Sequence, residues 1–353
     1  MRILHIINVR WFNATAWYAY RLAEAGIALG DESVIAGLPS SPVVNMAKDA
    51  GIGVFEADFN SNNILTIIKT IKRTASFIKD FKPDLIVCHR GEMFWWFSLY
   101  SRFFSKGWKL IRVRGDIRPP TTDFFSKYMH NKCAWRVITS AEIIRDKFLT
   151  KLKTPPYKVS TVYGGVNTDI FKPNKDLRLA TRKSLGYGND DFVVAIVGRF
   201  DPVKGHEVFL KACSLVYKNG MKNLKVLLVG FPENITVSQI ETLIKENGLE
   251  DVAFITGRRN DVAALMNASD LGVVASLGSE AICRVAMEFM ACGVPVVASD
   301  AGVLPEMFSD LNLYPMKDYE LLAQRIKRHN NYIKIYDSKD FYRQFISACS
   351  IDR

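Results

Sequence analysis

The chain has 353 residues, of which 48% are hydrophobic and 24% are charged, so it is long enough for two globular domains with ordinary cores. No apolar run approaches the ~20 residues that a membrane-spanning helix needs, and the apolar segment within residues 1–8 is too short for a secretion signal. The six cysteines are widely spaced, with neither CxxC nor zinc-site spacing. We therefore expect free thiols, no metal site and a cytoplasmic protein.

Strands and helices alternate along the first half of the chain. The clearest helix is 64–80, which has isoleucines on one stripe and basic residues off it. Alternation at this spacing predicts a doubly wound parallel sheet. Strands are expected at 3–8, 33–37, 54–55, 83–88, 109–113, 136–140 and 158–163, with helices at 15–29, 46–51, 64–80, 92–104, 122–133 and 141–148.

The pattern restarts after Gly164-Gly165 and a polar turn, which marks a domain boundary. We expect an amino-terminal domain over 1–165 and a carboxyl-terminal domain over 166–339, with a helix within 340–353 packing back on the first. Two doubly wound domains would face each other across a cleft at the carboxyl ends of their strands, where ligands bind. Strands are expected at 192–198, 224–229, 252–256, 271–275 and 294–298, with helices at 206–219, 238–247, 261–268, from about 281, at 319–330 and at 341–350.

The formal net charge of +11 lies almost wholly in the first half. Residues 1–170 contain 24 Lys and Arg against 14 Asp and Glu, whereas residues 171–353 contain 23 against 22. A basic domain predicts an acidic partner, such as an anionic membrane surface, a phosphorylated acceptor or a nucleic acid. No recognised nucleic-acid motif accompanies the basic residues, so we expect no nucleic-acid partner.

The stretch 275–300 reads as a strand end, a polar loop, a helix beginning near Ala281, a glycine turn and a buried strand. Free N–H groups at such a helix N-terminus suit a phosphate. Glu280 would lie at the mouth of this site and Glu288 ~12 Å further along, if the whole interval is helical. The pattern alone fits equally well a helix-dipole charge at Glu280 and a solvated helix residue at Glu288.

Two further strand-to-helix connections carry charged residues. In the first, Gly198 allows close backbone approach, and Arg199 and Lys204 are cations that could hold a diphosphate. The P-loop spacing is absent, and the alternative is a pair of surface charges. In the second, Arg258 lies where a nucleobase could be read and Asp261 is a candidate N-cap, although a plain turn explains both.

Together these motifs resemble the nucleotide-sugar domain of retaining glycosyltransferases of the family 4 type, "glycosyl transferases group 1", which have the two-domain GT-B fold. The resemblance runs from Tyr163 to Pro305 and covers the first half of the chain only in outline. Its motifs are GGVNTDIFKP, GRFDPVKG, FITGRRNDVAALMNASDLGVVAS, the Glu280/Glu288 pair and MACGVPVVASDAGVLPEM.

The resemblance implies a role for each matching residue. Arg199 and Lys204 would bind the donor diphosphate and stabilise it as it leaves, in place of a metal ion. Glu280 would contact the donor sugar, and Glu288 would accept hydrogen bonds from the ribose hydroxyls. The remaining donor-side positions are Gly198, Arg258, Ile282, Cys283, Arg284 and Val285.

The chain departs from the family pattern on the donor side. The family usually has Gly-Phe-Gly where this chain has Ala281-Ile282-Cys283, so the donor sugar and its nucleotide (UDP, GDP or ADP) do not carry over. We expect Ala281 and Cys283 to set the donor preference. No organic cofactor is expected.

The chain also departs from the pattern in its first half. The glycine pair that often follows the first strand is missing, and Asn13 and Ala14 occupy its place. The later histidine of many members is absent. Arg114 or Asp116 could fill its role, or the role could be unfilled. His89 ends the preceding strand and faces the expected cleft, although a single histidine is more often structural.

The implied function is retaining transfer of a sugar to a glycan or lipid-linked acceptor, in bacterial cell-surface polysaccharide or lipopolysaccharide synthesis. No covalent nucleophile is identified, and fixed cations would stabilise the leaving group. The alternatives are a sugar-nucleotide epimerase and a non-catalytic nucleotide-sugar-binding protein.

The basic first half could touch the inner face of the cytoplasmic membrane, or its charges could be solvated helix faces beside a core aromatic cluster. The residues behind this hypothesis are the helix 64–80, the aromatic run 94–97 and the series Arg102, Lys106, Lys109, Arg112, Arg114 and Arg118.

Overall fold

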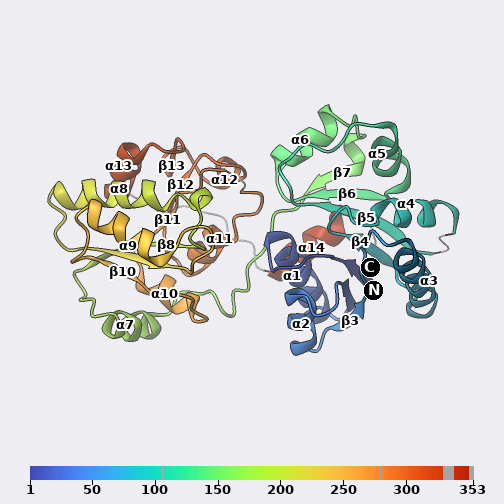
Figure 1. Ribbon diagram of the computed structural model, residues 1–353, viewed down its shortest axis with the longest axis horizontal. Coiled ribbons are helices and arrows are strands. Elements are labelled where there is room, and N and C mark those ends of the chain that lie inside the picture. Colours follow the sequence, from blue (N-terminus) through green and yellow to red (C-terminus); the bar gives the residue numbers. More distant parts are fainter. Residues whose placement is uncertain (105–106, 279, 329–337, 350–353) are drawn as a thin grey trace. The chain divides into compact units, whose positions relative to one another are not determined.

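The computed structural model describes residues 1–104, 107–278, 280–328 and 338–349, and these form two compact α/β units. The first contains Met1–Gly165 together with the last helix, α14 (Ser338–Ala348), and the second contains 166–328 (Figure 1). Each unit has one parallel sheet with helices on both faces. The prediction of two doubly wound Rossmann-like domains is therefore confirmed at the level of fold class.

The first sheet has the strand order β3-β2-β1-β4-β5-β6-β7, and every neighbouring pair is parallel. The order reverses between β1 and β4, and in open parallel sheets ligands bind at the carboxyl ends of the strands beside such a reversal. The strands are β1 (Arg2–Ile6), β2 (Glu32–Gly37), β3 (Gly53–Glu56), β4 (Leu85–Cys88), β5 (Lys109–Arg114), β6 (Arg136–Thr139) and β7 (Val159–Thr161). The helices are α1 (Ala14–Ala28), α2 (Pro42–Asp49), α3 (Ile64–Phe81), α4 (Phe94–Phe103), α5 (Phe124–Tyr128) and α6 (Glu142–Thr150), with a π turn η1 (Met129–Cys133) and a 3₁₀ turn η2 (Pro156–Lys158).

The second sheet has the order β10-β9-β8-β11-β12-β13, again all parallel, and it reverses between β8 and β11. Its strands are β8 (Phe192–Val197), β9 (Leu224–Val229), β10 (Ala253–Ile255), β11 (Leu271–Val274), β12 (Val296–Ser299) and β13 (Leu313–Tyr314). Its helices are α7 (Lys175–Ser184), α8 (His206–Lys218), α9 (Val237–Glu246), α10 (Val262–Ala268), α11 (Arg284–Ala291), α12 (Leu304–Met307) and α13 (Tyr319–Lys327), with a 3₁₀ turn η3 (Pro202–Lys204).

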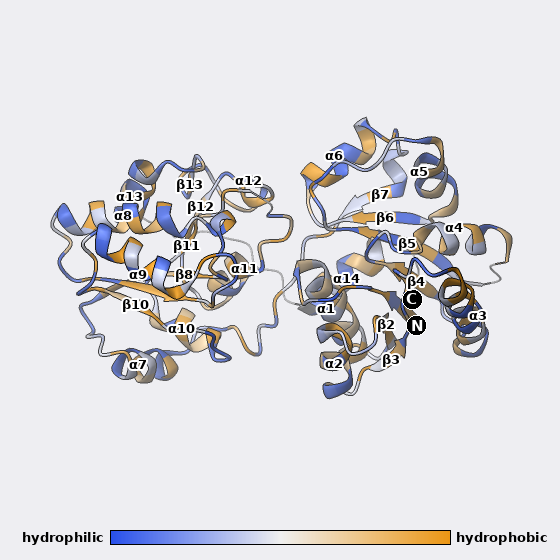
Figure 2. Ribbon diagram, in the orientation of Figure 1, coloured by the Kyte–Doolittle hydropathy of each residue, from blue (hydrophilic) through white to orange (hydrophobic). Residues whose placement is uncertain are grey.

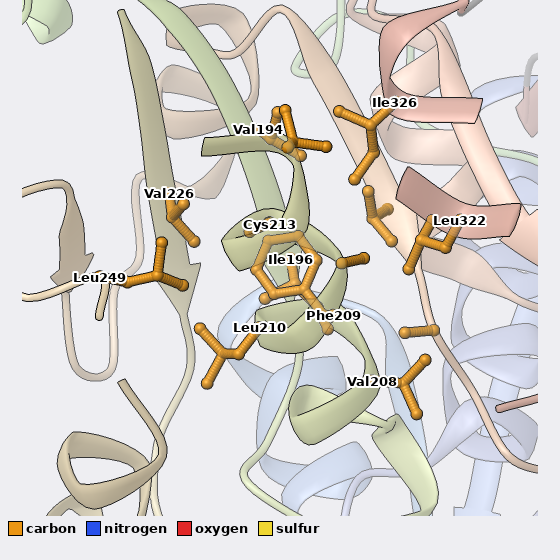
Figure 3. Close-up of a cluster of buried hydrophobic side chains, with 14 of the residues drawn as sticks. Val194, Ile196, Val208, Phe209, Leu210, Cys213, Val226, Leu249, Leu322 and Ile326 are labelled. Carbon is orange, nitrogen blue, oxygen red and sulfur yellow. The ribbon is translucent and has the colours of Figure 1, made fainter. Parts of the chain in front are cut away.

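The core of the second unit lies between the sheet and helices α8, α9 and α13. Val194 and Ile196 of β8 meet Phe209 of α8 and Leu322 of α13, and all four side chains are buried (Figure 3). The central strands are apolar on both faces, while the helices alternate between hydrophobic and hydrophilic residues (Figure 2). This is the pattern expected of a parallel sheet that is covered on both sides.

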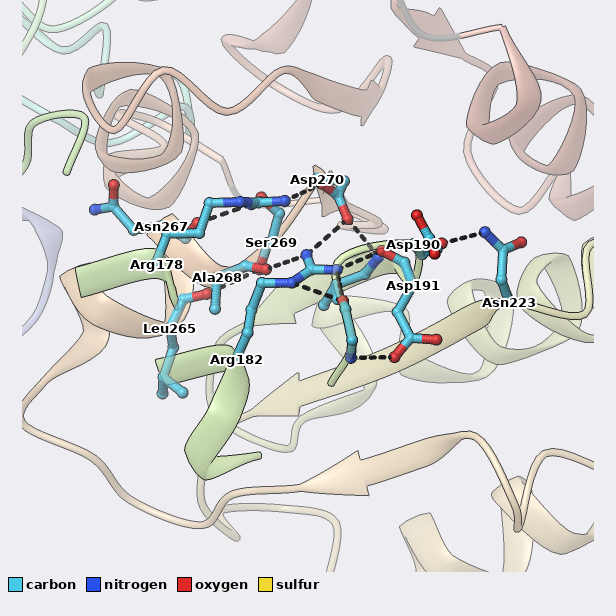
Figure 4. A network of polar contacts seen from close by, with 12 residues as sticks. Arg178, Arg182, Asp190, Asp191, Asn223, Leu265, Asn267, Ala268, Ser269 and Asp270 are labelled. Atoms are coloured by element: carbon cyan, nitrogen blue, oxygen red, sulfur yellow. Dashed lines mark hydrogen bonds and ion pairs between the residues drawn. The ribbon is translucent and has the colours of Figure 1, made fainter. Parts of the chain in front are cut away.

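A polar network fastens α7 to the amino-terminal edge of the same sheet (Figure 4). Arg178 and Arg182 of α7 both pair with Asp270, at 2.5 and 3.2 Å, just before β11. The buried guanidinium of Arg182 also donates to the carbonyl groups of Gly188, Asp191 and Ala268. Asp270 in turn accepts from the N–H of Val193 at 2.7 Å. A helix with few apolar residues is thus held mainly by charge-assisted hydrogen bonds.

The last helix, α14, packs against the first unit. The ring of Phe341 lies edge-on to Tyr18, with centroids 4.7 Å apart. The Tyr342 hydroxyl donates to Asp31 at 2.5 Å, and the Trp135 indole donates to the Cys349 carbonyl at 3.0 Å. The chain therefore returns to its first unit after completing the second.

Several predicted element bounds differ from the structure. Helices α7 and α12 and strand β13 are absent from the prediction, because they are short or largely polar. Helix α2 begins at Pro42 rather than at residue 46, since proline is well tolerated in the first turn. The predicted helix 122–133 is an α-helix only to Tyr128 and continues as a π turn.

The predicted apolar stripe of 64–80 is only partly buried. Ile64 and Ile68 of that stripe are 65% and 43% exposed, and the neighbouring Leu65, which is not part of it, is 74% exposed. The residues that α3 buries lie nearer its carboxyl end, because only that part packs against the unit. They are Thr70, Thr74, Ile78 and Phe81.

Candidate active site

The charged residues singled out in the second half gather at the carboxyl ends of β8 and β11, the two strands at which the sheet order reverses. Arg199 and Lys204 follow β8, and Glu280 follows β11. In open parallel sheets this reversal point is where ligands bind, since the connections on either side diverge and leave a crevice. The sheet topology therefore explains why residues about 80 positions apart lie together.

Close backbone contact brings the two loops together. Gly205 has φ +68°, and a Cβ added there would lie 1.9 Å from the carbonyl oxygen of Ala275. The N–H of Leu277 donates to the Val203 carbonyl at 2.8 Å across the same gap. Only glycine satisfies both the left-handed conformation and the close approach at residue 205. This contact fixes the distance between Lys204 and the loop that follows β11.

An ion pair lies at the centre of the site. The Lys204 ammonium is 2.5 Å from Oε1 of Glu280, and the Ser276 hydroxyl donates to the same oxygen at 2.5 Å. Glu280 is 7% exposed, and its backbone carbonyl accepts from the N–H of Val303. The carboxylate is therefore buried and held by two side chains, and the backbone of Glu280 is fixed by a third contact, while Lys204 remains 31% exposed.

Arg199 is oriented by Asp201. The Asp201 carboxylate accepts from Arg199 at 3.3 Å, from Asn234 at 2.7 Å and from the N–H of Val203 at 3.0 Å. Burial raises the pKa of Asp201, but these hydrogen bonds and the nearby guanidinium outweigh it and leave the pKa below its ordinary value. The Arg199 side chain is 46% exposed, so its guanidinium group is accessible to an anion.

Helix α11 begins at Arg284, which corrects the predicted start near Ala281. Cys283 has φ +43°, in the left-handed region that disfavours a side chain, so the backbone turns there before the helix starts. The interval from Glu280 to Glu288 is thus not wholly helical. Glu288 lies in the second turn, is buried, and pairs with Arg284 at 3.1 Å.

Ile282 and Cys283 are both buried, and the Cys283 thiol contacts Glu280. Burial and the neighbouring Glu280 charge raise the pKa of this thiol well above its usual range. Val285 lies within the first turn of α11, beside Arg284. These positions form the connection between the buried Glu280 carboxylate and the helix.

The connection in which Arg258 was expected to lie near a nucleobase follows β10. The Arg258 guanidinium lies over the Phe231 ring, 5.0 Å from its centroid, in a cation–π contact. Asp261 is the N-cap residue of α10, as predicted, but its side chain makes no capping hydrogen bond. Its carboxylate is instead held by Arg259, at 2.6 and 2.7 Å.

In the first unit, the residues after β1 and β4 also lie at a reversal point. Asn13 caps α1, whose first residue is Ala14, by accepting from the N–H of Ala16 at 3.0 Å. His89 is 2% exposed, and its Nε2 lies 3.1 Å from Nδ1 of His5. Burial, followed by the charges of His5 and Arg112, lowers the pKa of His89 far below its ordinary value. The buried ring favours the structural alternative for His89.

The residues of the basic series do not all lie on one surface of the first unit. Arg112 is 3% exposed and donates to the Cys88 carbonyl at 2.9 Å. Arg114 donates to the Arg118 carbonyl, and the Arg118 guanidinium donates hydrogen bonds of 2.6 to 3.1 Å to the Asp116 carboxylate. Arg102 and Lys109 lie at the opposite edge of the sheet, and Lys106 lies outside the described residues.

Sequence reasoning missed two residues of the second-unit site. Ser276 donates to Glu280, and Asp201 organises both Arg199 and the η3 turn. The signal for Asp201 was available, because an aspartate before a Pro-x-Lys turn is a strong cap. Ser276 had no comparable signal, since its role depends on the fold of the loop.

Within the described ranges, no group of three or more His, Cys, Asp and Glu side chains is placed to hold a metal ion. All six cysteines are free. Among the same residues, no helix combines the length and the apolarity needed to cross a membrane.

Comparisons with known proteins agree with this geometry. Residues 178–331 match the sequence profile of the family "Glycosyl transferases group 1". A D-inositol 3-phosphate glycosyltransferase of Mycolicibacterium smegmatis is 32% identical over 180 residues, which cover 50% of this chain and 40% of that relative. The chain thus matches less than half the length of that relative.

Two solved structures share the fold along almost the whole chain. HepE of Anabaena, solved with UDP and also with UDP-glucose, has a TM-score of 0.83 in its UDP complex, with 19% identity over 99% of this chain and 100% of that one. WaaG, a glycosyltransferase involved in lipopolysaccharide biosynthesis, has a TM-score of 0.63, with 14% identity over 99% and 94% of the two chains. The fold is that of GT-B glycosyltransferases, and together the matches support a glycosyltransferase.

Proposed function

We propose that this protein is a retaining glycosyltransferase of the family 4 type, which transfers a sugar from a nucleotide-sugar donor to a glycan or lipid-linked acceptor. The observation that carries the proposal is the Lys204–Glu280 pair at the reversal point of the second sheet, with Arg199 on the same loop. The family profile over residues 178–331 supports it.

In this proposal Lys204 and Arg199 stabilise the diphosphate as the bond to the sugar breaks. An ammonium group has three donors, and Glu280 occupies one of them, so Lys204 can hold a phosphate oxygen without losing its partner. Fixed cations in a partly buried site stabilise developing negative charge more strongly than water does. The reaction then needs neither a protein nucleophile nor a bound metal, and activity should persist in EDTA.

In this proposal the two glutamates contact different parts of the nucleotide-sugar donor. Glu280 lies beside Lys204 and would contact the sugar, while Glu288 in the second turn of α11 would accept from the ribose hydroxyls. Ala281 and Cys283 would narrow the sugar pocket. Because HepE binds UDP and UDP-glucose, a UDP-sugar is the first donor to test, followed by GDP- and ADP-sugars.

The acceptor would bind the first unit, where Arg114 ends β5 and Asn13, Ala14 and Asp116 follow the strands. We place the protein in the cytoplasm of a bacterium, at the membrane where cell-surface polysaccharide or lipopolysaccharide is made. The exposed start of α3, with Ile64, Leu65 and Ile68 close to basic residues, would be the membrane contact.

Product analysis tests the proposal against its alternatives. Nucleotide sugars are first screened for thermal stabilisation, because a ligand that binds only the folded state raises the melting temperature. The stabilising donor, with its sugar labelled, is then incubated with glycan and lipid-linked acceptors. Transfer with the donor's anomeric configuration kept supports the proposal. Release of an epimerised free sugar, inversion, or binding without turnover would each contradict it.

A further inference from the structure

Four arginines gather at the carboxyl ends of two neighbouring strands of the first sheet, and we call them the arginine cluster. They are Arg112 and Arg114 near the end of β5, Arg90 on the loop after β4 and Arg118 on the loop after β5. Residues two positions apart on a strand point to the same face, so the two β5 side chains lie on one side of the sheet. The cluster therefore lies at the edge where parallel sheets bind their ligands.

The carboxylates around the cluster do not balance its charge. Among the residues that the structure describes, two carboxylates pair with these arginines. Glu92 lies 2.7 Å from Arg90. Asp116 lies 2.6 Å from Arg118 and 4.0 Å from Arg114. Four guanidinium groups against two carboxylates leave an excess of two positive charges.

Arg112 is the most enclosed cation of the cluster. Its guanidinium donates to the carbonyl groups of Cys88 and Val113, at 2.9 and 2.5 Å, and lies 5.3 Å from the centroid of the Phe94 ring. These contacts hold the side chain without neutralising its charge. Burial, followed by the charge of Arg114, lowers its pKa to about 10. The cations of the cluster thus repel one another, and a bound anion would relieve that repulsion.

The loop after β5 holds two of these cations where solvent reaches them. The Lys147 ammonium donates to the Ile117 carbonyl. Arg114 donates to the Arg118 carbonyl at 2.9 Å. The side chains of Arg118 and Arg114 are nevertheless 84% and 21% exposed. An anion can therefore reach both guanidinium groups while the backbone that carries them is already held, which lowers the entropy cost of binding.

Asp116 shows how an anion is held on this loop. Its carboxylate accepts hydrogen bonds of 2.6 to 3.1 Å from the Arg118 guanidinium, and its side chain is 34% exposed. The same planar fork binds phosphate oxygens as readily as carboxylate oxygens. A ligand with more negative charge than one carboxylate would compete with Asp116 for Arg118.

We propose that the arginine cluster binds a phosphate monoester on the acceptor, which is then either a phosphorylated sugar or a lipid phosphate. A phosphate monoester carries close to two negative charges and three acceptor oxygens, which matches an excess of two positive charges better than a carboxylate does. The word acceptor rests on the proposed transferase function, whereas the binding of phosphate does not.

Isothermal titration of the full chain with glucose 6-phosphate tests the site. Arg118→Gln should weaken binding about tenfold, because hydrogen bonds to a charged group are lost. The matched control is Arg343→Gln, since Arg343 is an exposed arginine of the same unit that also pairs with an aspartate. The control should stay within about twofold of the wild type. Equal weakening in both variants, or no binding by the wild type, would overturn the proposal.

Asp116→Asn should move the affinity in the opposite direction. It removes the carboxylate that competes for Arg118, so glucose 6-phosphate should bind several-fold more tightly, whereas damage to the loop would weaken binding. Asp340→Asn removes the partner of Arg343 in the same way and should leave binding unchanged. Binding that is weaker in Asp116→Asn than in this control contradicts the proposed site.

The ligand and the unit that holds it are checked separately. Unphosphorylated glucose should not bind, and gluconate, a carboxylate, should bind more weakly than glucose 6-phosphate. Gluconate binding as tight as the phosphate would overturn the choice of phosphate. Lys204→Ala in the second unit should bind glucose 6-phosphate like the wild type. Loss of binding in Lys204→Ala, with binding kept in Arg118→Gln, would place the phosphate elsewhere and overturn the proposal.

Hexyl phosphate, which carries an alkyl chain in place of the sugar, distinguishes the two sources of the phosphate. If it binds more tightly than glucose 6-phosphate and loses affinity in Arg118→Gln, the acceptor is a lipid phosphate. If glucose 6-phosphate binds more tightly, the acceptor is a phosphorylated sugar.

Transfer assays separate this inference from the proposed function. With the donor from the thermal screen, labelled sugar should pass to a phosphorylated acceptor and not to its dephosphorylated form. Equal transfer to both forms would overturn the inference and leave the transferase function intact. No transfer to any acceptor, with phosphate binding still weakened in Arg118→Gln, would overturn the proposed function and support the phosphate site.

Discussion

Lys204 and Glu280 are 76 positions apart, yet the Lys204 ammonium lies 2.5 Å from the buried carboxylate of Glu280. A buried carboxylate without a partner would be costly, and the ammonium and the Ser276 hydroxyl offset that cost. The Lys204–Glu280 pair therefore carries no net charge. In the proposed reaction the diphosphate approaches a cation that is held in position rather than one that must be ordered.

His206 provides a pH-dependent prediction at the residue scale. It is 2% exposed, and burial, followed by the charge of Lys204, lowers its pKa to about 4. In the unfolded chain a histidine has a pKa near 6.5. Between these two values the unfolded state binds more protons, so the folded state loses stability as pH falls from 6.5 to 4.

The loss amounts to about 3 kcal/mol, from ~1.4 kcal/mol for each pKa unit. The free energy of unfolding should be measured by urea denaturation at pH 7, 5.5 and 4. Between pH 7 and pH 4 it should fall by about 3 kcal/mol less in His206→Phe than in the wild type. The Phe200 ring already lies edge-on to this position, which favours an aromatic replacement. Parallel declines in wild type and variant would contradict the pKa assignment.

Single residues were only partly predictable from the sequence. Arg199, Lys204 and Glu280 were identified as charged groups on strand-to-helix connections, because strand ends and glycines are visible in the pattern. Their partners were not, since Ser276 depends on loop geometry. The exposure of a residue was least predictable. Arg112 belongs to a basic series in the sequence, but its side chain is buried and donates to the carbonyl groups of Cys88 and Val113.

At the scale of elements, α7 depends on the network in Figure 4 more than on apolar burial. Arg182 is 3% exposed on its side chain and makes hydrogen bonds to three carbonyl groups as well as to Asp270. Removing one partner of a buried ion pair leaves the other charge uncompensated. Arg182→Ala should therefore lower the free energy of unfolding by about 3 kcal/mol.

Urea denaturation followed by circular dichroism measures this change. Lys183→Ala, at the exposed neighbouring position of the same helix, is the matched control and should stay within about 0.5 kcal/mol of the wild type. A loss below about 1 kcal/mol for Arg182→Ala would show that α7 is held by other contacts.

Elements were predictable in proportion to their length and periodicity. Long amphipathic helices such as α8 and α13 and buried strands such as β9 lie within a few residues of their predicted bounds. Helix α7 was missed because its sequence is mostly polar. The start of α11 was misplaced because Cys283 takes a left-handed conformation that its residue type does not suggest.

At the scale of the whole molecule, the basic excess of the first unit coexists with exposed apolar side chains. Ile64 and Leu65 begin α3 and are 65% and 74% exposed. Basic residues attract anionic lipid headgroups, and exposed apolar side chains nearby can insert into the bilayer, so both interactions favour binding to anionic membranes. We therefore predict that the protein co-sediments with anionic vesicles more than with neutral ones.

The double variant Ile64→Ser/Leu65→Ser should reduce co-sedimentation with anionic vesicles several-fold. Ile170→Ser/Leu179→Ser in the second unit changes the same two residue types at similar exposure, 55% and 54%, and should have no effect. Equal binding to neutral and anionic vesicles would rule out the charge-driven contact.

The fold class was the most predictable feature of the molecule. Alternating strands and helices, restarting after Gly164-Gly165, sufficed for two doubly wound sheets. A helix within 340–353 was expected to pack back on the first domain, but the individual contacts of α14 with Tyr18 and Asp31 join residues more than 300 positions apart, and no local pattern specifies them.

The central claim is that Lys204 stabilises a leaving diphosphate, and sugar transfer by the Lys204→Ala variant tests it most directly. Lys211→Ala is the matched control, since Lys211 is an exposed lysine of the same unit that also pairs with a glutamate. With the donor from the thermal screen, we predict that Lys204→Ala lowers the transfer rate by about 10²- to 10³-fold while keeping its circular dichroism spectrum. Lys211→Ala should stay within twofold of the wild type. A Lys204→Ala variant that transfers sugar at the wild-type rate would contradict the account.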